Sequence, residues 1–141
     1  MPSARAGDSD FDINRRLTVE ELRVAVDIDG TITAFPDVFR KLLGRFPDAI
    51  ILTGGIDQDP EHVNQDALIA GRVAQLTPII GPPNNEIVVC GGRTVLDVGR
   101  MKAEVCLQRK IDILIDDATV YCKAVARLSP TTAVLQVFAV D

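Results

Sequence analysis

Short apolar runs alternate along this chain with segments in which apolar residues recur every three to four positions. The runs have the length and composition of buried strands, whereas the segments between them have the period of helices that face a core. This alternation is typical of βαβ units, so the sequence predicts an α/β fold with a mostly parallel sheet of about five strands. The predicted strands are Arg23–Asp27, Ala49–Thr53, Glu86–Cys90, Ile111–Asp117 and Ala133–Val140.

Prolines and glycines mark the expected ends of the connecting helices. Pro47 and Pro78 close the first two helices, and Gly54 with Gly55 is expected to open a loop after the second strand. Gly99 suggests that the first part of the third helix is irregular. The expected helices cover about residues 36–47, 59–78 and 95–109, with a fourth running from near Tyr121 to Leu128.

The length of the chain predicts one domain. Its 141 residues include an expected flexible leader, residues 1–16, that is rich in Ser, Gly, Asp and Arg. Residues 17–141 are expected to form the domain itself. Hydrophobic residues make up 47% of the chain and charged residues 25%, which excludes general disorder.

Charge and cysteine content exclude several classes of function. The chain has 15 basic and 20 acidic residues, a net charge of −5, and no basic run of the kind that general nucleic-acid binding needs. No apolar run approaches the roughly 20 residues that span a bilayer, so we expect a cytoplasmic protein with no membrane partner. The three cysteines form no CxxC pair, which favours reduced, buried thiols over disulfides or a zinc site.

Polar residues gather where the predicted strands end. Asp27 ends the first strand, and Asp29, Gly30 and Thr31 follow it directly. Because open α/β sheets place their ligands at the carboxyl ends of parallel strands, these side chains are expected at a functional edge. The same edge is expected to receive the other polar residues near strand ends, namely Thr53, Gly54, Lys102, Asp116 and Asp117.

The order Asp-x-Asp-Gly-Thr, strand-terminal Thr, Lys and Asp-Asp resembles the four motifs of the haloacid dehalogenase superfamily. The resemblance spans Arg23 to about Leu128. It implies a Rossmann-like, three-layer hydrolase domain with strand order 5-4-1-2-3, and an Mg²⁺-dependent phosphatase activity. The substrate would be a small-molecule phosphate ester, and its hydrolysis would pass through an aspartyl-phosphate.

The resemblance also implies roles for the acidic residues. Asp27 would attack phosphorus and bind the metal through its other oxygen. Asp29 would bind the metal through its backbone carbonyl, and its side chain would act as general acid and base. Asp116 and Asp117 would complete the metal site, one directly and the other through water or from the second shell.

The remaining candidates would bind the phosphoryl group and limit repulsion among the carboxylates. Thr53 and the Gly54 amide would donate to phosphoryl oxygens, and Thr31 would order the turn beside the substrate. Lys102, expected near the N-terminal turn of its helix, would pair with the phosphate and Asp27. The apolar stripe of that helix is expected to include Val98, Met101 and Val105.

Simpler interpretations remain open for several of these residues. Asp29-Gly30 is also a common turn signal, and Asp116 or Asp117 is also a suitable N-cap for the next helix. Lys102 also fits a solvated helix position, in which case Arg93 or Arg100 would supply the cation.

The spacing of the motifs leaves no room for a cap module. Only 21 residues separate Thr31 from Thr53, and 48 separate Thr53 from Lys102. We therefore expect a capless member that borrows a lid from residues 33–36 or 55–60, or from another subunit of a homo-oligomer.

Three other functions compete with hydrolysis. A catalytically silent binding or scaffold protein would keep this fold, and a phosphotransferase would pass the phosphoryl group to another hydroxyl. A receiver domain of a response regulator also uses an acidic pair, an Asp, a Thr and a Lys, but in the opposite chain order. Phosphomonoester hydrolysis therefore remains the preferred prediction.

Overall fold

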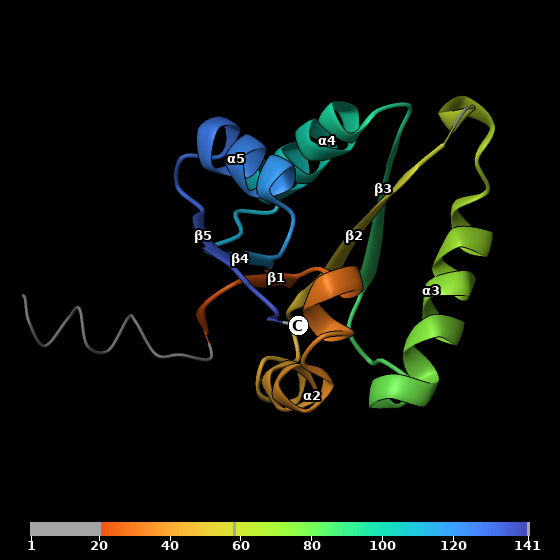
Figure 1. The fold of residues 1–141 in the computed structure, drawn as a ribbon, viewed down its shortest axis with the longest axis vertical. Coiled ribbons are helices and arrows are strands. Elements are labelled where there is room, and N and C mark those ends of the chain that lie inside the picture. Colours follow the sequence, from red (N-terminus) through yellow and green to blue (C-terminus); the bar gives the residue numbers. More distant parts are fainter. Residues whose placement is uncertain (1–20, 58, 141) are drawn as a thin grey trace, which may run out of the picture.

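A computed structural model describes residues 21–57 and 59–140. The predicted leader, residues 1–16, and the first four residues of the predicted domain lie outside the described residues. The described chain forms a five-stranded parallel sheet with helices on both faces (Figure 1). The predicted α/β class and the parallel sheet are confirmed.

The strand order is β3-β2-β1-β4-β5, which is the predicted order read from the opposite edge. The strands are β1 (Val24–Val26), β2 (Ile50–Ile56), β3 (Ile87–Gly92), β4 (Ile113–Asp116) and β5 (Ala133–Gln136). The helices are α2 (Pro36–Arg45), α3 (Gln65–Ile80), α4 (Val95–Gln108) and α5 (Thr119–Leu128), with short irregular helical turns at η2 (Ile28–Ile32) and η3 (Pro60–His62).

Two apolar clusters fill the space between the sheet and its helices. Successive side chains of a strand point to opposite faces, so Val24 and Val26 of β1 pack with α2 and α3, whereas Ala25 packs with α4 and α5. Figure 1 shows the same division, with α4 and α5 together on one side of the sheet and α2 and α3 on the other. The result is the expected three-layer arrangement.

Single helices and short loops connect the strands, and no second module is inserted within residues 21–57 and 59–140. The described chain is therefore one domain without a cap. None of the helices in this part of the chain is both long and apolar enough to cross a membrane.

The glycine pair after the second predicted strand does not open a loop. β2 continues to Ile56, and Gly54 and Gly55 pair with Cys90 and Gly91 of β3. A side chain at Gly54 would overlap Val98 of α4. This glycine is therefore required for close packing of the helix on the sheet.

The fifth strand is shorter than predicted and ends at Gln136. It lies at the edge of the sheet, and the following Val137 amide still donates to the Asp116 carbonyl at 3.0 Å. Beyond it, Phe138 and Val140 are exposed. The apolar residues that extended the prediction to Val140 therefore belong to an exposed end of the described chain.

The helix α3 begins later and ends later than predicted. The Asn64 side chain caps it by accepting from the Ala67 amide at 3.1 Å, so the helix begins at Gln65 and not at Asp59. Pro78 lies inside the last turn, where a single missing amide donor is tolerated, and the helix ends only before Gly81. Gly81 has a φ of +86°, which favours glycine at this position.

The helix α4 corrects two further predictions. It is regular through Gly99, and the missing side chain there allows Ala124 of α5 to approach closely. Its buried stripe runs through Val98, Lys102 and Cys106, whereas Met101 is exposed. These three positions are spaced by four residues and therefore lie on one face of the helix.

Candidate active site

The carboxyl ends of β1 and β4 lie side by side and carry the two most buried acids. The Asp27 amide, just after β1, donates to the Ile115 carbonyl of β4 at 3.0 Å. Asp27 lies two residues after Ala25, and Asp116 two residues after Leu114, so strand alternation turns both acids toward α4. Both acids are buried, with exposed fractions of 5% for Asp27 and 0% for Asp116.

Lys102 joins these two acids from the middle of α4, and not from its first turn. Its Nζ atom lies 3.1 Å from Asp27 Oδ1 and 2.7 Å from Asp116 Oδ2. The side chain is fully buried, which rules out the solvated interpretation of Lys102. We call Asp27, Lys102 and Asp116 the buried charge cluster.

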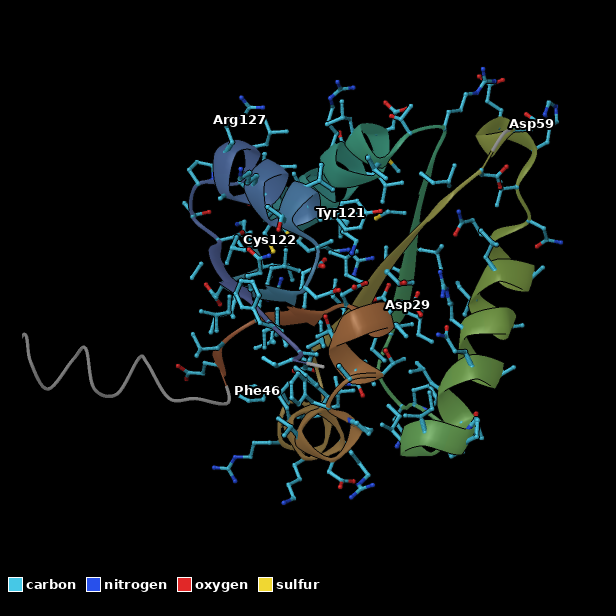
Figure 2. All side chains as sticks on the ribbon, in the orientation of Figure 1. Asp29, Phe46, Asp59, Tyr121, Cys122 and Arg127 are labelled. Atoms are coloured by element: carbon cyan, nitrogen blue, oxygen red, sulfur yellow. The ribbon has the colours of Figure 1, made fainter. Side chains whose placement is uncertain are left out.

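Two neighbours shape the path of the Lys102 side chain. Its ammonium group lies 4.4 Å from the centre of the Tyr121 ring, a cation–π contact from α5. A Cβ atom at Gly54 would lie 3.5 Å from Lys102 Cε, so the side chain passes close to β2 where that strand carries a glycine. Figure 2 shows Tyr121 on α5 at this edge of the sheet. The sequence had suggested only a core position for Tyr121.

Burial and charge shift the pKa values of this cluster. Burial raises the pKa of Asp27 to about 7; Lys102 opposes this shift and Asp116 adds to it. Burial by itself would lower the pKa of Lys102, but the carboxylates of Asp27 and Asp116 outweigh it, so that the pKa is raised. Lys102 is therefore held as a cation between two acids.

Asp117 brings a third carboxylate to the same place. Asp27, Asp116 and Asp117 each offer an oxygen, and these oxygens lie within 4.8 Å of one another. One ammonium group does not balance three carboxylates, and a set of hard oxygen ligands suits Mg²⁺. The chemistry of the donor set therefore fits the predicted cation.

The turn after β1 holds Asp117 in position. Thr31 is buried, and its hydroxyl donates to Asp117 Oδ1 at 3.3 Å. Gly30 has a φ of +80°, and a side chain there would overlap the Asp117 carboxylate. The Asp-Gly-Thr sequence thus forms a support for Asp117 as well as a turn.

Neither acid of the Asp116-Asp117 pair caps helix α5. The N-cap residue is Ala118, which makes no side-chain capping bond, and its amide donates to Asp116 Oδ1 at 3.0 Å. Asp116 thereby orders the end of β4, since its second oxygen binds Lys102. The capping interpretation of these acids is wrong.

Thr53 has an unusual environment on β2. It is fully buried, yet its hydroxyl has no hydrogen-bond partner within the described part of the chain. An unpaired buried hydroxyl costs about 1–3 kcal/mol, so such a group is typical of a site that a ligand completes. Thr53 directly precedes Gly54, which packs against Lys102.

Asp29 lies apart from this cluster. Its side chain is 61% exposed and turns toward α3, where Arg72 Nη1 donates to Oδ2 at 3.1 Å and Gln75 Nε2 donates to Oδ1 at 2.7 Å. Figure 2 shows Asp29 on the turn after β1. Nothing in the sequence pattern distinguished Arg72 or Gln75 from other polar residues of a helix surface.

The alternative cations, Arg93 and Arg100, lie elsewhere. They line an open groove of about 680 Å³ on the flank of α4, together with Met101 and Leu107. Arg100 pairs there with Asp97 at 3.4 Å. Lys102, and neither arginine, is thus the cation that contacts Asp27.

The cysteines take no part in a disulfide and are poor nucleophiles. Cys90, Cys106 and Cys122 are free and buried, as the sequence predicted. Burial raises the pKa of the Cys90 thiol to about 11 and that of Cys106 to about 12. A thiolate is the reactive form, so Asp27 is the better candidate nucleophile at this edge.

Comparison of the chain with protein-family models, with curated proteins and with solved structures gave no match. The functional argument therefore depends on the residues and geometry of this site.

Proposed function

We propose that this protein is an Mg²⁺-dependent phosphohydrolase that cleaves phosphomonoesters through an aspartyl-phosphate on Asp27. The observation that carries the proposal is the buried Asp27 carboxylate, which shares Lys102 with Asp116 and lies close to Asp117. Phosphoryl transfer needs an anionic nucleophile, a cation to offset repulsion and donors for the phosphoryl oxygens. The unpaired Thr53 hydroxyl supports the last requirement.

Asp27, Asp116 and Asp117 would hold Mg²⁺, together with the Asp29 carbonyl. When bound, this cation neutralises carboxylate and phosphoryl charge and so lowers the repulsion between nucleophile and substrate. Lys102 keeps Asp27 and Asp116 in place and offsets part of their charge.

The reaction has two steps at Asp27. In the first, a carboxylate oxygen forms a bond to phosphorus, the ester P–O bond breaks, and Asp29 gives a proton to the leaving oxygen. In the second, water attacks the phosphorus and loses a proton to Asp29. The aspartyl P–O bond then breaks, which releases inorganic phosphate and restores the Asp27 carboxylate.

Three further groups bind the phosphoryl oxygens in this proposal. The Thr53 hydroxyl and the Gly54 amide donate to them from β2, and Lys102 lies on the adjacent side of Asp27. Thr31 acts through Asp117, whose carboxylate it contacts.

The first test is hydrolysis of an aryl phosphate with Mg²⁺, with EDTA and by the Asp27→Asn variant. We expect metal-dependent turnover that falls about a thousandfold or more in the variant, because the amide is not a nucleophile. Asp48→Asn is the matched control, since Asp48 is exposed and lines a pocket at the opposite edge of the sheet. Undiminished turnover by Asp27→Asn would overturn the proposal.

A further inference from the structure

Helix α3 contacts Asp29 through two side chains that the sequence gave no reason to select. Arg72 and Gln75 lie one turn apart, and between them they donate to both oxygens of the Asp29 carboxylate, at 3.1 Å and 2.7 Å. We call this pair the α3 clamp. More than 40 residues separate Asp29 from each member of the clamp, so the contact depends on the tertiary fold.

The clamp is also tied to the sheet and to itself. Arg72 Nη2 donates to the Gly54 carbonyl at 3.0 Å, and Arg72 Nη1 donates to Gln75 Oε1 at 2.9 Å. One guanidinium group therefore fixes Asp29 and Gln75 relative to the end of β2. The planar, forked donors of arginine suit this arrangement, and the single ammonium group of lysine does not.

Stability does not account for the α3 clamp. The Asp29 side chain is 61% exposed and that of Arg72 is 23% exposed, and ion pairs in such settings contribute about 0–1 kcal/mol. Yet every polar atom of the Asp29 carboxylate has a donor, and Arg72 contacts three acceptors. The arrangement specifies where one carboxylate lies.

We propose that Arg72 and Gln75 are positioning residues, which hold the Asp29 carboxylate beside the Thr53–Gly54 end of β2 for proton exchange with the leaving oxygen. This inference rests on the proposed function, in which Asp29 exchanges protons with the leaving oxygen and with water. Neither clamp residue touches the reacting atoms. Their effect is to restrict the rotamers of Asp29, and a catalytic group that is misplaced by about 1 Å loses much of its rate effect.

The leaving group distinguishes this role from a general structural one. An alkyl phosphate releases a basic alkoxide that needs a proton as the P–O bond breaks, whereas para-nitrophenyl phosphate releases a stable phenolate that does not. Loss of the α3 clamp should therefore slow the alkyl ester selectively. Loss of Asp27 geometry or of folding would slow both esters.

The experiment measures kcat/KM for glycerol phosphate and para-nitrophenyl phosphate in Arg72→Met, Gln75→Met and the unchanged protein. We expect a fall of about tenfold or more for glycerol phosphate and less than about twofold for the aryl ester, a part of the range for general acid catalysis. Arg100→Met is the matched control, because Arg100 also pairs with an Asp on a helix surface. Urea unfolding shows whether each variant keeps its stability.

Each outcome separates this proposal from the one beneath it. Equal loss for both esters, no loss for either, or a gain for glycerol phosphate would overturn the positioning role and leave the phosphohydrolase in place. Turnover of neither ester by the unchanged protein would overturn the proposed function, and the positioning role with it. Arg72→Lys should restore only part of the glycerol phosphate activity, since lysine lacks the fork that contacts both Asp29 and Gly54.

Discussion

The two edges of the sheet each hold acids and bases at hydrogen-bond distance, but in different surroundings. At the carboxyl edge, Lys102 lies 3.1 Å and 2.7 Å from the oxygens of Asp27 and Asp116, and all three are buried. At the amino edge, Arg109 binds both oxygens of Glu86 at 2.8 Å and 2.9 Å, and the two side chains are about half exposed. The distances are nearly the same, so distance does not distinguish the two groups.

Burial is what separates them. Water screens the Glu86–Arg109 pair, so its contribution to stability is small. The buried charge cluster has lost its water, so each charge there depends on its protein partners. A buried carboxylate near neutral pKa is a common property of catalytic groups, whereas an exposed pair at its ordinary charge has no such potential. The contrast assigns chemistry to one edge and only modest stabilisation to the other.

The largest expected effect on stability is that of removing Lys102. Lys102→Met leaves Asp27 and Asp116 buried beside each other without a cation, and breaking such a group costs about 3–5 kcal/mol. Urea unfolding at neutral pH with EDTA measures this change. Lys123→Met on the exposed face of α5 is the control. A loss below about 1 kcal/mol would mean that water reaches the cluster, and the comparison of the two edges would fail.

The pH dependence of stability should follow from Asp27 next. Its pKa is about 7 in the folded chain against a model value of 3.8, so the folded state holds a proton that the unfolded state loses. Unfolding free energy in EDTA should therefore fall as pH rises from about 4 to about 7, by a few kcal/mol at most, and then level off. Asp27→Asn should flatten this decline.

The Asp48→Asn variant should keep the full decline, because Asp48 is exposed at the amino edge. A profile that rises over this pH range in the unchanged protein would contradict the direction of the Asp27 shift. Unlike the turnover assay, this measurement does not depend on any substrate.

The buried charge cluster was predictable because it follows from short-range rules. Apolar runs that end in acids place Asp27 and Asp116 at the carboxyl edge of a parallel sheet. Lys102 lies four residues after Val98 and four before Cys106, so the helical period already places it on a buried face. We had instead expected Met101 and Val105 on that face, because residue type was weighted above spacing.

The α3 clamp and the packing of Gly54 were not predictable from the chain. Arg72 lies on a helix surface where the sequence shows only ordinary polar residues, and its partners lie on the turn after β1 and on β2. Glycine pairs favour loops in general, but at Gly54 the contact with Val98 of α4 decides the residue type. Both features depend on the distance between elements, which local periodicity does not contain.

The smallest expected effect is that of Glu86→Gln at the amino edge. The hydrogen bond from Arg109 lowers the pKa of Glu86, so the pair stabilises the fold above the ordinary pKa of glutamate and loses this effect as pH falls. Because the pair is exposed, we expect less than about 1 kcal/mol at low salt and almost none at about 1 M salt. Urea midpoints of the unchanged and variant proteins at both salt concentrations measure this difference. A loss above about 2 kcal/mol that persists in high salt would show that a short, bidentate contact stabilises the fold even when water reaches it, and the energetic distinction between the two edges would then no longer follow from burial.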